Sequence, residues 1–308
     1  MSDLDRQRVE HDARRNAGDM RHATRYSEAV SRYLGAVGYR EAGRPPATAE
    51  PHLAVGATEQ STGVVVVGVD ETPASYTAVD HAAIEAELRG WELRLLHVQH
   101  AGGVRAPAGD AGARLLERMT DRVHAYSPTV AVTNRISVGA ASTVLLSDAH
   151  DANLVVVGHR HGPAGTAFGL SVADRVAAHH TGPVLVVRVP GWPPGPDFGA
   201  RPIVVGVDGS STSKQAVDFA IAEARVRGCD VIMLHAAGQE DVLEDHLGVI
   251  VHRRAVVGSP VTALISASGT AAAVVVGRRG GSGLAGAVLG SVSRAMVQQA
   301  YCPVFLVG

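Results

Sequence analysis

The feature that most constrains this chain is an internal repeat that covers most of its 308 residues. Short motifs of the first half recur in the second half in the same order, at a spacing of 138 residues that falls to 119 and then 120. A repeat of this kind indicates two copies of one folding unit. The matching motifs are Gly68-Val-Asp70 with Gly206-Val-Asp208, Leu96-His97 with Leu234-His235, Val138-Gly139 with Val257-Gly258, Gly158 with Gly277, and Gly182-Pro-Val184 with Cys302-Pro-Val304.

Each copy alternates short β-branched runs with longer segments of helical periodicity. Residues 64–69 form a continuous apolar run, typical of a strand buried on both faces, and residues 75–89 have a helical pattern that ends at Gly90. Such alternation implies a parallel sheet with helices on both faces. We therefore predict an α/β fold of two tandem, doubly wound, parallel five-stranded sheets. The expected strands are residues 64–69, 93–98, 129–138, 154–157 and 184–187, then 203–207, 231–235, 250–257, 273–276 and 304–307.

The changes in spacing locate the differences between the two copies. The fall from 138 to 119 residues gives the first copy a long second connection over 102–128, with a helix at 115–126. The second copy has only a short connection there, over 238–248. The step from 119 to 120 places one missing residue inside the glycine motif of the first copy.

Shifts in composition divide the chain into four parts. Residues 61–189 hold the first copy and residues 201–308 the second, with a linker rich in proline and glycine over 190–200. Residues 1–60 form a polar tail, which we expect to be partly disordered or helical. Within it, residues 24–37 carry apolar side chains at helical spacing, which predicts either an amphipathic helix or a mobile tail with a transient helix.

Composition excludes several classes of function. The net charge of −2 argues against a general nucleic-acid binder. No apolar stretch reaches about 18 residues without a charge or a break, so we expect no membrane insertion. The charged N-terminus lacks the apolar region of a signal peptide. Cys229 and Cys302 have no metal or redox spacing, and no cluster of metal ligands stands out. We expect buried thiols and a cytoplasmic protein.

A glycine motif in the second copy predicts a phosphate site. Gly277 and Gly280 follow an apolar run, and Gly290-Ser291 comes after nine further residues. Glycine lets a backbone approach closely, and the N–H groups at a helix start attract anions. Arg278 or Arg279 could add positive charge. The alternative for Ser291 is a plain helix N-cap.

A carboxylate is expected to face this motif. In a doubly wound sheet, ligands bind at the carboxyl ends of the strands where the strand order reverses, which here lies between the first and fourth strands of the copy. The first strand of the second copy ends in Asp208, whose carboxylate can accept hydrogen bonds from a base amine or a ribose hydroxyl. The alternative is that Asp208 is a turn or N-cap residue before Ser210.

The first copy carries a damaged version of the same motif. Asp70, Gly158 and Ser171 remain, but His161 and Leu170 replace the second and third glycines. A side chain at either position can obstruct the approach of the backbone to a ligand. We expect the first copy to serve mainly as a packing partner, unless a shifted gap lets a neighbouring glycine take over.

The second copy resembles the universal stress protein family. That family carries the pattern Gly-x2-Gly-x9-Gly-(Ser/Thr), which Gly277, Gly280, Gly290 and Ser291 match. The resemblance covers residues 63–189 and 201–308. It also rests on segments around the motif, namely Val205-Gly-Val-Asp-Gly-Ser210, Val276-Gly-Arg-Arg-Gly-Gly-Ser282, Leu289-Gly-Ser-Val292 and Cys302-Pro-Val304.

The resemblance implies a strand order of 3-2-1-4-5 in each copy and ATP binding, with or without Mg²⁺. It places Asp208 on the adenine side of the nucleotide and the backbone at Ala236 beside the base. It implies that Gly277 and Gly280 line the ribose and phosphates and that Gly290 and Ser291 hold phosphate. Arg279 and Val292 are further candidates for the nucleotide site, as are Asp70, Gly158 and Ser171 in the first copy.

The resemblance also implies a function and partners. The two copies would pair through their last strands, and we expect a homodimer and an unidentified regulatory protein partner. The predicted function is a nucleotide-dependent stress-response regulator that holds ATP mainly in the second copy. No catalytic residue stands out. The alternatives are an interaction module that binds no nucleotide and a slow ATP hydrolase.

Overall fold

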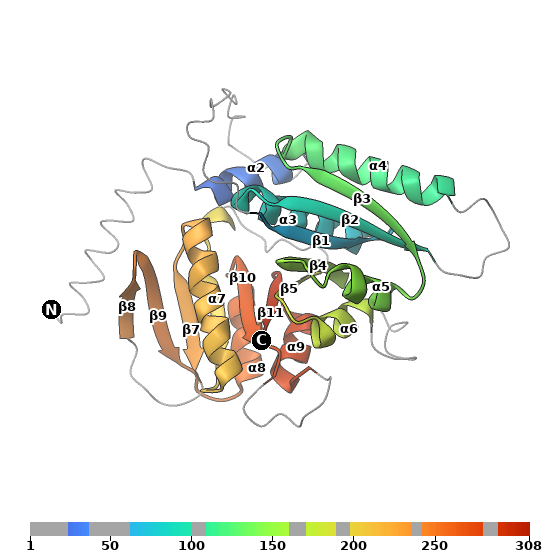
Figure 1. The fold of residues 1–308 in the computed structure, drawn as a ribbon. Coiled ribbons are helices and arrows are strands. Elements are labelled where there is room, and N and C mark those ends of the chain that lie inside the picture. The colour runs from blue at the N-terminus through green and yellow to red at the C-terminus, as the bar shows by residue number, and fades with distance from the viewer. Residues whose placement is uncertain are drawn as a thin grey trace.

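A computed structural model describes residues 24–36, 62–99, 109–159, 171–188, 198–235, 242–279 and 289–308. Its centre is one sheet of 11 strands in the order β3-β2-β1-β4-β5-β11-β10-β6-β7-β9-β8 (Figure 1). The predicted α/β class is confirmed. The first copy comprises β1 (Val64–Val69), α3 (Pro73–Arg89), β2 (Glu92–Gln99), α4 (Gly109–Tyr126), β3 (Val132–Val138), α5 (Ala141–Asp148), β4 (Leu154–His159), α6 (Val172–His179) and β5 (Val184–Arg188).

The second copy follows the same course with one exchange. It comprises η2 (Phe198–Ala200), β6 (Ile203–Val207), α7 (Ser211–Arg227), β7 (Val231–His235), β8 (Val242–His246), β9 (Val249–Ala255), α8 (Pro260–Ser268), β10 (Ala273–Gly277), α9 (Ser291–Gln299) and β11 (Val304–Val307). Where the first copy has α4, the described part of the second connection holds the short strand β8, which pairs antiparallel with β9 at the sheet edge.

The two copies pair through their last strands, as expected, so their two sheets form one continuous sheet of 11 strands where ten strands were predicted. Within each copy the strands take the order 3-2-1-4-5, and β8 adds a strand that the sequence pattern did not indicate. The last strands β5 and β11 pair antiparallel, with Leu185 opposite Phe305. The edges of two isolated sheets would leave backbone N–H and C=O groups unpaired, and this pairing satisfies them.

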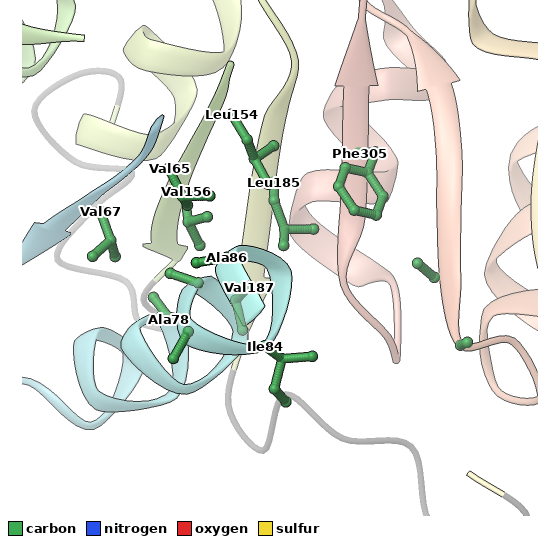
Figure 2. Packing of buried hydrophobic residues seen from close by; sticks show 14 of the residues in the cluster. Val65, Val67, Ala78, Ile84, Ala86, Leu154, Val156, Leu185, Val187 and Phe305 are labelled. Atoms are coloured by element: carbon green, nitrogen blue, oxygen red, sulfur yellow. The ribbon is translucent and has the colours of Figure 1, made fainter. Parts of the chain in front are cut away.

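Helices cover both faces of the sheet and enclose two apolar clusters. One cluster lies under α2, α3, α4 and α7, and the other lies under α5, α6, α8 and α9. Because side chains alternate along a strand, Val65 and Val67 belong to the first cluster and Val66 to the second. Figure 2 shows the first cluster, with Leu185 of β5 and Phe305 of β11 on neighbouring strands.

A buried group of four charged side chains joins α3 to α7. Glu85 and Arg89 on α3 occupy the positions that Glu223 and Arg227 occupy on α7, at the repeat spacing of 138 residues. Arg227 Nη2 lies 2.5 Å from Glu85 Oε1, and its Nε lies 3.2 Å from Glu223 Oε2. Arg89 contacts both carboxylates. The four charges therefore pair within and between the copies, as buried charges must.

Of the two alternatives for residues 24–37, the structure shows the amphipathic helix, as α2 (Arg25–Ala36), and not a mobile tail; its apolar face is packed. Tyr26 and Tyr33 are almost fully buried, and α2 contacts α3 and α4 of the first copy as well as α7 and η2 of the second (Figure 1). The Arg227 guanidinium lies 4.4 Å from the ring centre of Tyr26. Thus α2 covers the group of four charges and contacts both copies.

No helix among the described residues is long and apolar enough to span a membrane. Cys229 and Cys302 are free thiols, and burial raises their pKa values to about 11 and about 12. Both thiols are therefore protonated at neutral pH, which makes them poor nucleophiles.

Candidate nucleotide site

The ends of β6 and β10 form the site. These two strands are parallel neighbours, with Val205 opposite Val275, and the strand order of the second copy reverses between them. Asp208 follows β6 directly, and Gly277 is the last residue of β10. Because both strands run in the same direction, their carboxyl ends meet at one edge of the sheet, as the sequence predicts.

Asp208 organises the turn that leads into α7. Its Oδ1 accepts hydrogen bonds from the Ser210 backbone N–H at 3.0 Å and from the Ser210 hydroxyl at 2.6 Å. Ser210 then caps α7, because its Oγ accepts the backbone N–H of Ser213 at 3.1 Å. The turn role considered for Asp208 is therefore real, and it holds the carboxylate at the edge where a ligand would bind.

Two hydroxyls tie this turn to the glycine motif, and sequence reasoning missed one of them entirely. Ser210 Oγ lies 3.0 Å from Thr212 Oγ1, which donates to the Arg279 carbonyl at 2.6 Å. The Arg279 backbone is thus fastened to the start of α7. Asp-x-(Ser/Thr) occurs at the same place in both copies, and this repeated turn signal could have identified the capping hydroxyl but not Thr212.

Gly277 allows α7 to pack closely against the end of β10. A Cβ at this position would lie 3.2 Å from the Thr212 side chain. In the first copy, a Cβ at Gly158 would lie only 2.6 Å from the carbonyl oxygen of Ala74 in α3. Ala74 and Thr212 occupy matching positions, so the first glycine of the motif has the same packing role in both copies.

Gly290 is the N-cap of α9, and its own N–H is already engaged. It donates to the Arg278 carbonyl at 2.8 Å, while the Ser293 hydroxyl donates to the Gly277 carbonyl at 2.6 Å. These two bonds fix the start of α9 against the end of β10. Ser291 is exposed, and no side chain of the described residues caps the helix. The first-turn N–H groups of α9 therefore face the site without an internal cap.

Arg278 and Arg279 have different surroundings. The Arg278 side chain is buried, and its guanidinium donates to the carbonyls of Thr181 and Gly182 in the first copy and of Gly308 at 2.7 Å. Burial, with a smaller effect of neighbouring Arg279, lowers the pKa of Arg278 to about 10. Arg278 therefore joins the two copies, and of the two arginines only Arg279 is exposed at the site.

The remaining predicted positions divide between the two copies. Val292 is half-buried in the first turn of α9, whereas Ala236 and Gly280 lie outside the described residues. In the first copy, Asp70 Oδ1 accepts the Thr72 N–H at 2.9 Å, so it forms the same turn as Asp208. Ser171 is the N-cap of α6 and is bonded to Asp174. No group of three or more potential metal ligands occurs in the described part of the chain.

The comparison with protein families matches this arrangement. A sequence model of the universal stress protein family matches residues 62–188, 199–247 and 237–308. The chain belongs to the universal stress protein family. A universal stress protein of Mycobacterium tuberculosis is 31% identical in an alignment that covers 80% of this chain and 96% of the relative.

A solved structure of the family shares this fold. A universal stress protein of Archaeoglobus fulgidus superposes with a TM-score of 0.57 at 16% identity and covers 79% of this chain and 97% of its own. A second solved structure, a universal stress protein in complex with cAMP, is 27% identical, covers 41% of this chain and 96% of its own, and has a TM-score of 0.36.

Proposed function

We propose that this universal stress protein binds ATP, mainly in the second copy, and acts as a nucleotide-dependent regulator of a stress response in the cytoplasm. The observation that carries the proposal is the start of α9, which has no side-chain cap within the described residues and lies at the sheet edge that also holds Asp208. A helix N-terminus of this kind attracts the negative charge of a phosphate.

The two ends of the proposed site suit the two ends of a nucleotide. Asp208 supplies a carboxylate, the group that accepts hydrogen bonds from a ribose hydroxyl or a base amine. Gly290 and Ser291 present backbone N–H groups and a hydroxyl, which suit phosphate oxygens. Arg279 adds positive charge beside them. When bound, ATP would signal its presence to a protein partner or to a second copy of the chain.

Direct analysis of bound nucleotide tests this proposal. The full chain is purified and denatured, and any released nucleotide is identified by mass spectrometry and counted per chain. Labelled ATP is then titrated into nucleotide-free protein. We expect saturable binding of about one ATP per chain, and the absence of saturable binding would favour the alternative of an interaction module.

Substitution of Gly290 tests the location of the site. Gly290→Val adds a branched side chain where the phosphate would approach the helix, so we expect at least a tenfold loss of ATP affinity, which corresponds to about 1.4 kcal/mol. Ser171→Ala, at the corresponding helix start of the first copy, is the control and should leave the ATP ratio unchanged. If Gly290→Val binds ATP like the wild type, the site lies elsewhere. A turnover well above roughly 1 per second would instead favour an enzyme.

A further inference from the structure

The helix α2 lies outside the part of the chain that matches the family. The family model begins its match at residue 62, whereas α2 spans Arg25–Ala36. The helix is nevertheless docked against both copies, where it contacts α3 and α4 of the first and α7 and η2 of the second (Figure 1). We call the residues that α2 contacts on these four elements the docking surface. In this chain the family fold therefore carries an additional helix that bridges its two units.

The buried side of α2 has the pattern of a helix that binds as a ligand. Four aromatic or apolar side chains, each at most 2% exposed, stand at positions i, i+3, i+4 and i+7 of the helix. These are the positions through which amphipathic helices bind to other proteins. The four residues are Tyr26, Ala29, Val30 and Tyr33. Glu28 and Ser31 on the other side are exposed, so α2 buries a single stripe of side chains.

The first half of α2 fits closely against the second copy. The Tyr26 ring lies beside the Arg227 guanidinium, as described above, which gives a cation–π contact. Gly199 of η2 lies directly under the helix, because a Cβ there would be 2.5 Å from the Cα of Ser27. A larger residue at Gly199 would occupy the space of the α2 backbone. The second copy is therefore shaped to accept this helix.

The second half of α2 contacts the first copy. Tyr33 packs edge-on against Tyr126 of α4, with the ring centres 4.6 Å apart. Arg32 donates from Nε to the Tyr126 carbonyl at 3.1 Å and forms an ion pair with Glu87 of α3. The two aromatic residues of the stripe, seven positions apart, thus bind different copies.

The helix is held less firmly than the sheet beneath it. A helix of 12 residues is marginally stable in water by itself, so α2 depends on its docking surface to stay helical. Thr24 supplies a local cap, because its Oγ1 accepts the Ser27 N–H at 3.1 Å. The 11 strands are fixed to one another by backbone hydrogen bonds, and among the described residues α2 joins none of them. Elements of this kind open at a lower free energy than a central sheet.

We propose that α2 is a releasable strap: a helical ligand, carried by the chain itself, that occupies a docking surface formed jointly by both copies and leaves it while the sheet stays folded. When docked, α2 ties the two copies together and covers the four charges that join α3 to α7. When released, it uncovers this shared face. The inference does not depend on the proposed nucleotide site.

Gly199→Ala tests the strap in the full chain. The three heavy atoms nearest to the added methyl all belong to Ser27, so the change acts first on the docking of α2. We expect hydrogen exchange, followed by mass spectrometry, to become faster by about tenfold or more in residues 25–36 and by less than about threefold in β1 and β6. Gly269→Ala is the matched control, because its methyl would lie an ordinary 3.4 Å from the Ser266 carbonyl oxygen, and it should change neither rate.

Two other results of this experiment would overturn the inference. Equal acceleration in α2 and in the sheet, or a Gly199→Ala chain that does not fold, would mean that α2 opens only together with the whole fold. Unchanged exchange in residues 25–36 would mean that the close contact at Gly199 does not hold the helix.

A labelled peptide of residues 24–36 tests whether the docking surface binds the helix as a separate ligand. In a full chain that carries Tyr26→Ala and Tyr33→Ala, the strap lacks both aromatic side chains, so the wild-type peptide should bind saturably. Adding Gly199→Ala to that chain should weaken peptide binding by about tenfold or more, because tyrosine anchors contribute only when they are fully packed. Absence of saturable binding, or loss of protection in β1 and β6 of the doubly substituted chain, would overturn the inference.

Discussion

The two copies share a backbone plan but differ where a phosphate would bind. In the first copy, Ser171 and Asp174 close the start of α6 with a capping box. In the second, α9 begins at Gly290 without a side-chain cap among the described residues. Both copies keep the packing role of the first glycine and the turn formed by the aspartate. The comparison teaches that the first glycine and the aspartate support the fold in both copies, whereas the described residues at the start of the fourth helix differ in how that helix is capped.

The largest expected effect concerns the buried group of four charges that joins α3 of the first copy to α7 of the second. Arg227→Met leaves Glu85 and Glu223, which are both almost fully buried, with Arg89 as their remaining cation. We expect a loss of about 3–5 kcal/mol in the free energy of unfolding, measured by urea denaturation. The matched change Arg89→Met should cost less, because the side chain of Arg89 is 10% exposed and that of Arg227 only 3%. Equal losses would mean that the difference in exposure between the two arginines has no effect on stability.

The next effect compares the first glycines of the two motifs. At Gly158 a Cβ would lie 2.6 Å from a backbone oxygen that cannot move aside easily, whereas at Gly277 it would lie 3.2 Å from a side chain. We expect Gly158→Ala to destabilise the fold by about 3 kcal/mol and Gly277→Ala by about 1 kcal/mol. The first copy should therefore tolerate an alanine at the first glycine of its motif less well than the second copy does. The reverse order in urea unfolding would contradict the packing role assigned to Gly158.

A smaller effect depends on pH and concerns only the first copy. Burial, and to a lesser extent Arg278, lowers the pKa of His180 from 6.5 to about 4, so the folded protein keeps this side chain neutral. Between these two values the unfolded chain binds more protons than the folded one, so stability is lost as the pH falls from 6.5 towards 4. We expect the contribution to reach about 2 kcal/mol.

His180→Ala provides the control, because the matching residue of the second copy is Ala300. The variant should lose less free energy of unfolding than the wild type between pH 7 and pH 4.5, measured by urea denaturation at both values. If the two proteins lose the same amount, His180 is not the group responsible.

Local pattern was enough to predict most of the fold. The strand predicted at residues 64–69 is β1 with the same bounds, and the helix predicted at 75–89 is α3 with two further residues at its start. The strand predicted at 129–138 begins three residues later, at Val132. β-branched runs and helical periodicity depend on near neighbours in the chain, and that is why they can be read from sequence. The same reasoning placed Asp208 and Gly277 at one edge of the sheet.

The contacts between the copies were harder to predict. The short β8 strand lies in a connection that has no clear periodicity, and the pairing of β5 with β11 was expected only from the family resemblance. Arg278 was a candidate for binding phosphate, but its guanidinium donates hydrogen bonds to backbone carbonyls of both copies. The partners of such groups are distant in sequence, so no local pattern identifies them.

The sequence alone determined that this protein is a duplicated α/β unit with one complete and one damaged glycine motif, because spacing and residue type are local properties. The tertiary structure decided that four buried charges join α3 to α7 under α2, and that Asp174 caps the start of α6 whereas no side chain of the described residues caps α9. These features depend on which polar groups meet in space, and each buried group must find its partner there.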